Sequence, residues 1–547
     1  MRREDTYKSQ VYYFLNNKLF MAFLGILSVM AYGYFVFHYS RNPEEMLTEL
    51  YYAPTNAIIS QGRFGTPLLH YIFNIYQELP LIMPFLGVIF LVMNAVLFSA
   101  FVKFMTIKQY PLYVYMIFAG MLVVMPFIQE IIYYPNQAMS IPLCYMLTTI
   151  SIVCISRIKF DRHAMFIAIV AFILAMSIYE SFLMVFALQF VFFMMLLINQ
   201  RVMRFRDVSY FVYAFAIIVG MALVYKFVIS DTMKLIFDSK LPSYSQYVDS
   251  YMQYDRKGIG DIIVSIWKYF VYYFYVNAFF NYSVLLLDLS IILSLVLMIY
   301  FGIKNSKWNY LFIPAMIGLV FFLPIYTGKD VQYRTYQVAS LFVPLVFLWI
   351  AQILSQYKRL AYFFIAIMYV AIIRQAIDVS KFLFLNNQMY KETAQIAQKV
   401  ANDIYNISGT SKPVAMLGRP KFSKQLFAQS FTTEDNKLAK YFVDKGLVAP
   451  EKNPPYPGLL FMKNRLLECS FWYWGLDVGN NDVAYYFSKN GAFQKNALFL
   501  KFMAREGYEF ENYTGDFSNF NNIKKNMPHY PEPGYIQETD DCIVVNF

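Results

Sequence analysis

The sequence predicts an all-α, polytopic membrane protein with about eleven transmembrane helices, followed by a small C-terminal α/β soluble domain. Of its 547 residues, 59% are hydrophobic and only 15% are charged, whereas soluble domains carry about 25% charged residues. Apolar runs of roughly 20 residues, the length that crosses a bilayer, recur until about residue 379. We therefore expect a membrane domain at 1–379 and a soluble domain at 380–547.

The apolar runs place the spans in order along the chain. A polar, basic segment precedes the first span and is expected to lie along the cytoplasmic membrane surface. The run 163–199 is too long for one span, so it predicts two helices joined by a tight turn at 177–181. The other spans are expected at about 20–38, 81–102, 110–128, 138–156, 209–229, 283–303, 309–327, 337–356 and 360–378. Long external loops are expected at 39–79 and 230–282.

The basic residues between the spans indicate the orientation. The net charge is +11, but residues 381–547 carry 19 Lys and Arg against 17 Asp and Glu, so nearly all the excess belongs to the membrane domain. There it collects in short loops on the side of the N-terminus, as expected for cytoplasmic loops. This distribution argues against a nucleic-acid partner and predicts an extracytoplasmic C-terminal domain.

One aromatic run, 262–280, leaves the topology open. It is rich in Tyr and Phe and contains Trp267 and Lys268, which favours a helix lying in the membrane interface. The alternative is a further membrane-crossing helix, which would invert every later loop.

The C-terminal domain has its own pattern. A helix is expected at 390–405, and strands at 413–417 and 542–547. Cys469 and Cys542 could pair if this domain is extracytoplasmic.

Candidate site residues gather on the expected outer face, where ionisable groups at membrane depth tend to be functional. They are Glu44, Glu45, Glu49, Arg63, Glu130, Tyr179, Glu180, Lys329 and Arg334. A carboxylate can take a proton from an attacking hydroxyl, so Glu45 is the preferred general base, with Glu44 and Glu49 as rivals. The alternative is that these acids only complement the dipole of a loop helix.

Arg334 comes just before an expected span, where it could hold a phosphate bidentately with help from Lys329, or anchor the chain at the headgroups. Glu180 lies in the predicted turn and is either a site residue or a cap at the water boundary. No phosphate-loop or dinucleotide-binding motif is present, and the four histidines show no metal-ligand spacing. No cofactor or metal is expected.

Four segments resemble the bacterial type II glucosyltransferase family of the GT-C superfamily. They are Asn42–Glu45, Gln61–Gly65, Ile178–Ser181 and Tyr333–Arg334, and the likeness extends loosely over 15–420. The family commonly has aspartates where this chain has Glu44 and Glu45, and Tyr-Gln where it has Tyr179-Glu180. The resemblance implies a GT-C-like fold, a polyprenyl-phosphate sugar donor, with glucose as the sugar, and a surface-glycan acceptor such as O-antigen or a teichoic-acid-like polymer.

These observations favour a glycosyltransferase in the bacterial cytoplasmic membrane. In this interpretation Arg334, Lys329, Arg63, Tyr179, Glu180 and Glu130 bind the substrates. A transporter or lipid-linked-glycan flippase is one alternative, and a non-enzymatic scaffold for envelope assembly is another.

Overall fold

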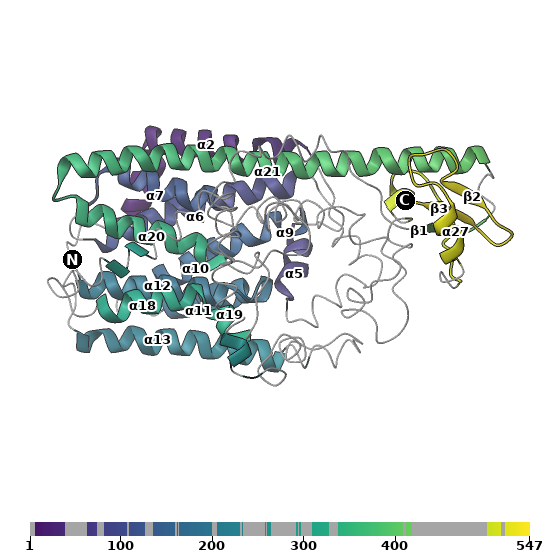
Figure 1. Ribbon diagram of the computed structural model, residues 1–547. Coiled ribbons are helices and arrows are strands. Elements are labelled where there is room, and N and C mark those ends of the chain that lie inside the picture. The colour runs from purple at the N-terminus through teal and green to yellow at the C-terminus, as the bar shows by residue number, and fades with distance from the viewer. Residues whose placement is uncertain are drawn as a thin grey trace. The chain divides into compact units, whose positions relative to one another are not determined.

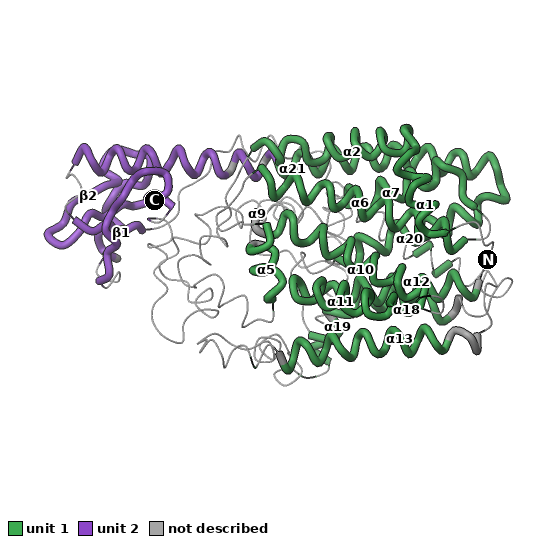
Figure 2. Tube along the Cα trace, turned by 180° about the vertical axis from the view of Figure 1, so that it is seen from behind, with its two compact units in different colours: residues 1–39, 54–383 green, residues 40–53, 384–547 purple. Residues whose placement is uncertain are grey.

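The computed structural model describes the parts of the chain that carry most of the predicted helices. The described residues are 6–38, 63–73, 81–106, 109–125, 135–158, 161, 163–199, 205–229, 232, 258, 260–263, 292–293, 295–296, 309–327, 337–407, 412–417, 500, 502–515 and 520–547. Those up to 383 belong to one compact unit and those from 384 onward to a second (Figure 2).

The first unit is built of helices that pack side by side (Figure 1). They are α1 (Tyr7–Asn16), α2 (Lys18–Phe37), α5 (Gly65–Ile72), α6 (Ile82–Met105), α7 (Leu112–Val124), α9 (Pro135–Ala138), α10 (Ser140–Arg157), α11 (His163–Ile178), α12 (Phe182–Asn199), α13 (Phe205–Val224), the π-helix η1 (Tyr225–Ile229), α18 (Asn309–Val320), α19 (Phe322–Thr327), α20 (Gln337–Leu354) and the beginning of α21 (Lys358–Ile407).

Within the described residues, six helical segments are long and apolar enough to cross a membrane. They lie in α2, α6, α10, α13 with η1, α20 and α21. Several also expose large apolar side chains, such as Tyr213, Val224 and Val228 on α13 and η1. An exposed apolar surface of this kind is stable in lipid and costly in water. The chain is therefore a multi-pass membrane protein, while the total of eleven spans stays a prediction.

Local sequence signals account for the first two helices. The Thr6 side chain caps α1 by accepting a hydrogen bond from the Ser9 amide at 3.3 Å. Asn17 then ends α1 and caps α2, because its Oδ1 accepts from the Phe20 amide at 3.0 Å. The buried Phe14 ring joins the two helices to the bundle by packing against Phe20 and Tyr115.

The predicted hairpin within 163–199 is confirmed, because α11 ends at Ile178 and α12 begins at Phe182. The apolar segments 112–124 and 309–320 also form helices where spans were expected. Two predicted elements, 262–280 and 283–303, fall mostly outside the described residues.

Two helices differ in length from the prediction. The expected span at 309–327 is interrupted at Phe321, since Pro324 has no amide hydrogen to bond the carbonyl of Val320 four residues earlier. The expected span at 360–378 does not end there: α21 continues to Ile407 and includes the helix predicted at 390–405. No glycine or proline occurs in its 50 residues, so no strong breaker stops it.

The second unit contains a small three-stranded sheet, which confirms both predicted strands. β1 (Val414–Leu417) pairs in parallel with β3 (Ile543–Asn546), and β2 (Ile536–Glu538) pairs with β3 in the antiparallel sense, giving the order β1-β3-β2. A short helix, α27 (Asn521–Asn526), precedes β2.

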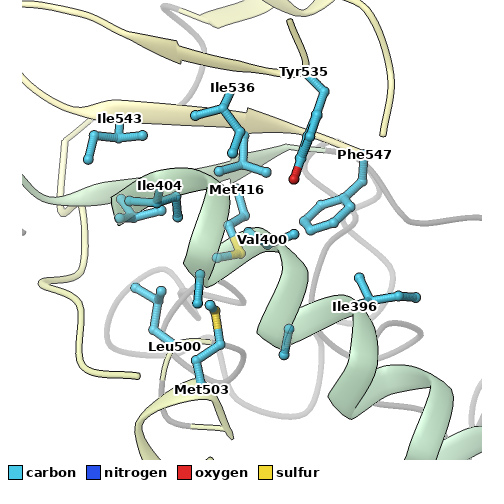
Figure 3. Close-up of a cluster of buried hydrophobic side chains, with 14 of the residues drawn as sticks. Ile396, Val400, Ile404, Met416, Leu500, Met503, Tyr535, Ile536, Ile543 and Phe547 are labelled. Carbon is cyan, nitrogen blue, oxygen red and sulfur yellow. The ribbon is translucent and has the colours of Figure 1, made fainter. Parts of the chain in front are cut away.

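Both faces of this sheet are covered. On one face, Met416, Ile543 and Val545 pack against Val400 and Ile404 of α21 (Figure 3). On the other, a second buried cluster contains Ala415, Leu417, Phe520, Met527, Cys542 and Val544. The alternation of side chains along each strand explains the two clusters. Cys542 is a buried free thiol, and Cys469, with which we expected it could pair, lies outside the described residues.

Candidate functional site

Three of the predicted site residues are described, and the structure brings them together. Arg63 precedes α5, and Tyr179 and Glu180 form the turn between α11 and α12. The remaining predicted site residues fall outside the described part of the chain: Glu44, Glu45, Glu49, Glu130, Lys329 and Arg334.

Arg63 and Glu180 form a two-point ion pair. The Nε of Arg63 donates to Oε2 of Glu180 at 3.0 Å, and Nη2 donates to Oε1 at 2.6 Å. The planar guanidinium matches a carboxylate in this fork geometry, which fixes both direction and distance. Both side chains are about one-fifth exposed, so the pair is reached from outside the helix bundle without being fully solvated.

Gly65 explains how the segment carrying Arg63 approaches α11 so closely. A Cβ at this position would overlap the Ser177 hydroxyl and lie 2.8 Å from Cγ1 of Ile178. Only glycine leaves room for α5 to meet the end of α11 at this point. This contact brings Arg63 to the turn that carries Glu180.

Lys226, which the sequence analysis did not single out, joins the same cluster. Its Nζ lies 3.7 Å from Oε2 of Glu180, and its side chain is only 1% exposed. It belongs to η1, where α13 changes from α- to π-helical geometry, a distortion that often marks functional sites. A single lysine within an apolar span was the available signal, because a buried ammonium needs a partner.

Aromatic rings border the charged groups. The guanidinium carbon of Arg63 lies 4.9 Å from the centre of the buried Tyr179 ring, within the range of a cation–π interaction. Phe64 packs edge-on against Tyr225 with ring centres 5.1 Å apart. The rings come from the same segments as the charged residues, so they fasten α5, the α11–α12 turn and η1 to one another.

The environment keeps Glu180 ionised. Partial burial by itself would raise its pKa, but the charges of Arg63 and Lys226, together with the hydrogen bonds from Arg63, outweigh burial and lower the pKa to about 2. A carboxylate with this pKa is a poor proton acceptor at neutral pH. Glu180 therefore suits the positioning of cations better than acid–base catalysis.

The turn is also tied to α20. Ser181 donates to Oε1 of Gln337, the first residue of α20, at 3.1 Å. The hydroxyl of Tyr145 on α10 donates to the Gln337 carbonyl at 2.8 Å. Both contacts are buried, so the residue next to Glu180 is held by helices distant in sequence.

Among the described residues, no group of three or more His, Cys, Asp or Glu side chains is arranged to hold a metal ion. The chain matches no protein-family model, no curated protein and no solved structure.

Proposed function

We propose that the protein is a membrane glycosyltransferase that moves a sugar, glucose by the family resemblance, from a polyprenyl phosphate to a surface glycan such as O-antigen or a teichoic-acid-like polymer. One observation carries the proposal most directly. Arg63, Tyr179 and Glu180, which the sequence marks as candidate substrate-binding residues, meet at one end of α11 and α12 in a multi-pass membrane protein.

The chemistry assigns distinct roles to a base and to cations. The carboxylate of Glu45, with Glu44 and Glu49 as alternatives, would take the proton from an acceptor hydroxyl. The hydroxyl oxygen then bonds to the anomeric carbon, and the bond from that carbon to the phosphate oxygen breaks. The polyprenyl phosphate leaves with the electron pair, and nearby cations stabilise its developing charge.

Arg334 is proposed to hold the donor phosphate, assisted by Lys329, while Glu130 contacts the substrates. These residues and the three candidate bases lie outside the described residues. The support for including Arg334 is its position three residues before Gln337, whose side chain receives a hydrogen bond from Ser181 beside Glu180.

The proposed location is the bacterial cytoplasmic membrane, with the cluster and the C-terminal domain outside. Lys103 and Arg157 lie in the last turns of α6 and α10, and Lys358 begins α21, as expected for cytoplasmic ends. A reporter fused after Phe547 is expected to be active only outside the membrane. Activity in the cytoplasm would contradict this orientation and indicate that 262–280 crosses the membrane.

A transporter would need a polar path through the bundle. The best described candidates are Asn94, Thr149 and Gln189 in the middle of α6, α10 and α12. They are 3% exposed or less and form interhelical bonds: Thr149 donates to Asn94 at 2.8 Å, and Gln189 donates to Thr149 at 3.1 Å. This arrangement supports helix association more than passage of a polar substrate.

An assay of sugar transfer by the purified protein decides between a glycosyltransferase and the non-enzymatic alternatives. Protein in lipid nanodiscs is supplied with polyprenyl-phosphate [¹⁴C]glucose and a cell-surface glycan acceptor, and label in the polymer is measured. Each of Glu44, Glu45 and Glu49 is replaced by Gln, and one replacement is expected to lower the rate by about 10²–10⁴-fold. Wild-type transfer by all three variants would exclude these bases, and no transfer with any lipid-phosphate sugar would exclude the enzyme.

A further inference from the structure

Lys226 occupies a costly position. It is almost completely buried within an apolar helical segment that is long enough to cross a membrane. An ionisable side chain in such a segment is rare and marks a substrate site or a charge relay more often than a structural contact. A methionine of similar length would pack there without that cost. Lys226 therefore calls for an explanation beyond packing.

Lys226 and Arg63 converge on the same oxygen atom. Oε2 of Glu180 lies 3.0 Å from Nε of Arg63 and 3.7 Å from Nζ of Lys226. The two cations come from segments separated by more than 160 residues, and Glu180 draws them together. A guanidinium and an ammonium side by side are the two side-chain groups that bind phosphate best, the first as a fork and the second as a point charge.

The surroundings strengthen an ionic contact at this place. The Tyr179 ring lies against Arg63, and Phe64 packs against Tyr225, the residue that precedes Lys226 in the chain. Electrostatic attraction rises as water is excluded. Arg63 and Glu180 remain about one-fifth exposed, whereas Lys226 is only 1% exposed, so a ligand reaches the cluster from the side of Arg63.

We propose that Arg63 and Lys226 together bind the phosphate of a lipid-linked substrate, and that Glu180 is a positioning residue that holds the two cations in place. The identity of the ligand rests on the proposed function, whereas the presence of a phosphate site rests on the cluster itself. The shared chemistry is a phosphate ester, carried either by a prenyl lipid or by a soluble molecule.

Binding can be measured without sugar transfer. The probes are a short-chain prenyl phosphate, the corresponding prenol, and inorganic phosphate, each titrated into the full-length protein in nanodiscs. We expect prenyl phosphate to bind and the prenol to bind at least tenfold more weakly. Lys226→Met and Arg63→Gln should each weaken prenyl-phosphate binding by about tenfold or more, because each removes a charged partner in a partly dry site. Lys226→Arg should retain part of the affinity.

Thermal unfolding of the ligand-free variants separates binding from structure. Lys226→Met should unfold at the wild-type temperature or above it, since a buried charge is replaced by an apolar chain while Glu180 keeps Arg63. Lys358→Met, at the exposed start of α21, is the matched control and should change neither property. If Lys226→Met does not insert into the membrane, the prenyl-phosphate affinities of Arg63→Gln and Lys226→Arg decide whether the cluster binds phosphate.

Several outcomes would overturn the proposal. Unchanged prenyl-phosphate affinity in Lys226→Met or Arg63→Gln would assign the cluster to structure alone, as would a loss of affinity in Lys226→Met that is matched by a lower unfolding temperature of that variant. Equal binding of inorganic phosphate and prenyl phosphate would assign the site to a soluble anion. Prenyl-phosphate binding that depends on Lys226, in a protein that transfers no sugar, would support the site and contradict only the glycosyltransferase function.

Discussion

Arg63 and Glu180 are 117 positions apart, yet the guanidinium of one meets both carboxylate oxygens of the other, at 3.0 and 2.6 Å. The pair fastens the segment before α5 to the turn between two apolar helices. Lys226 contacts the same carboxylate from η1. Glu180 therefore joins its own turn to two other chain segments, and the first prediction concerns its charge.

Replacing Glu180 by Gln keeps its shape and removes the charge that holds the cations. We expect the rate of sugar transfer to fall by about tenfold or more, because a displaced cation stabilises the charge that develops on the leaving phosphate much less. The rate is measured on protein matched for insertion.

The matched control for this change is Glu538→Gln. Glu538 pairs with Lys412 at 2.9 Å in the second unit, but both side chains are 30% exposed or more. Exposed pairs contribute little, so transfer should stay close to the wild-type rate. Equal effects of the two replacements would show that Glu180 acts only through general stability.

The pH dependence follows from the lowered pKa of Glu180. Because the pKa lies below its usual value of 4.5, the stabilisation by the ion pair is fully present above about pH 4.5 and is lost as the pH falls through about 2. Between pH 5 and 8 the pair does not titrate. Any acidic limb in kcat/KM within this window must then belong to another group, such as the proposed base.

Rates of wild-type protein and Glu180→Gln measured from pH 5 to 8 check this expectation. The midpoint of an acidic limb should be the same in both, although the plateau of the variant is lower. A limb that disappears in Glu180→Gln would mean that Glu180 itself exchanges a proton during the reaction.

Gly65→Ala should separate α5 from α11. The added Cβ would overlap Ser177 and press against Ile178, so α5 must shift and carry Arg63 with it. We expect a loss of transfer of tenfold or more with the protein still inserted. Gly25→Ala in α2 is the control, because a Cβ there meets no atom within 4 Å and alanine favours the helix. Equal activity of the two variants would remove the constraint that we assign to Gly65.

Within the described residues, the sequence predicts the long apolar helices and the hairpin turn, because apolar length and the polar residues at 177–181 are local signals. It does not predict where α21 ends, since the absence of glycine and proline allows a helix to continue without requiring it. The π-helical geometry of η1 depends on packing and has no local pattern.

For the site, too, the sequence predicts features that have a local signal and misses those that depend on packing. The turn residue Glu180 and the outer-face residue Arg63 can be chosen from the sequence, because both are ionisable groups beside apolar runs. Their pairing depends on how α5 packs against α11. This contact joins residues far apart in the chain, so no short segment of the sequence predicts it. Lys226 is harder to select, because it is a single lysine within an otherwise apolar span and its partner Glu180 lies 46 residues earlier in the chain.

Arg334 provides the last test, because its proposed role overlaps with that of Lys226. It precedes Gln337 by three positions, and Gln337 is bonded to Ser181 beside Glu180. If Arg334 and Lys226 hold the same phosphate, Arg334→Ala should lower transfer by about 100-fold, as the loss of one preorganised donor does in other enzymes. Arg334→Lys keeps the charge without the fork and should recover part of the rate. Arg359→Ala, at an exposed arginine near the start of α21, should have no effect.

The double variant of Arg334→Ala with Lys226→Met should lose less transfer activity than the product of the two single losses, because residues that share one partner are coupled. An alanine variant with unchanged rate and donor affinity would make Arg334 a headgroup anchor, and independent losses would place the two cations at different substrate groups.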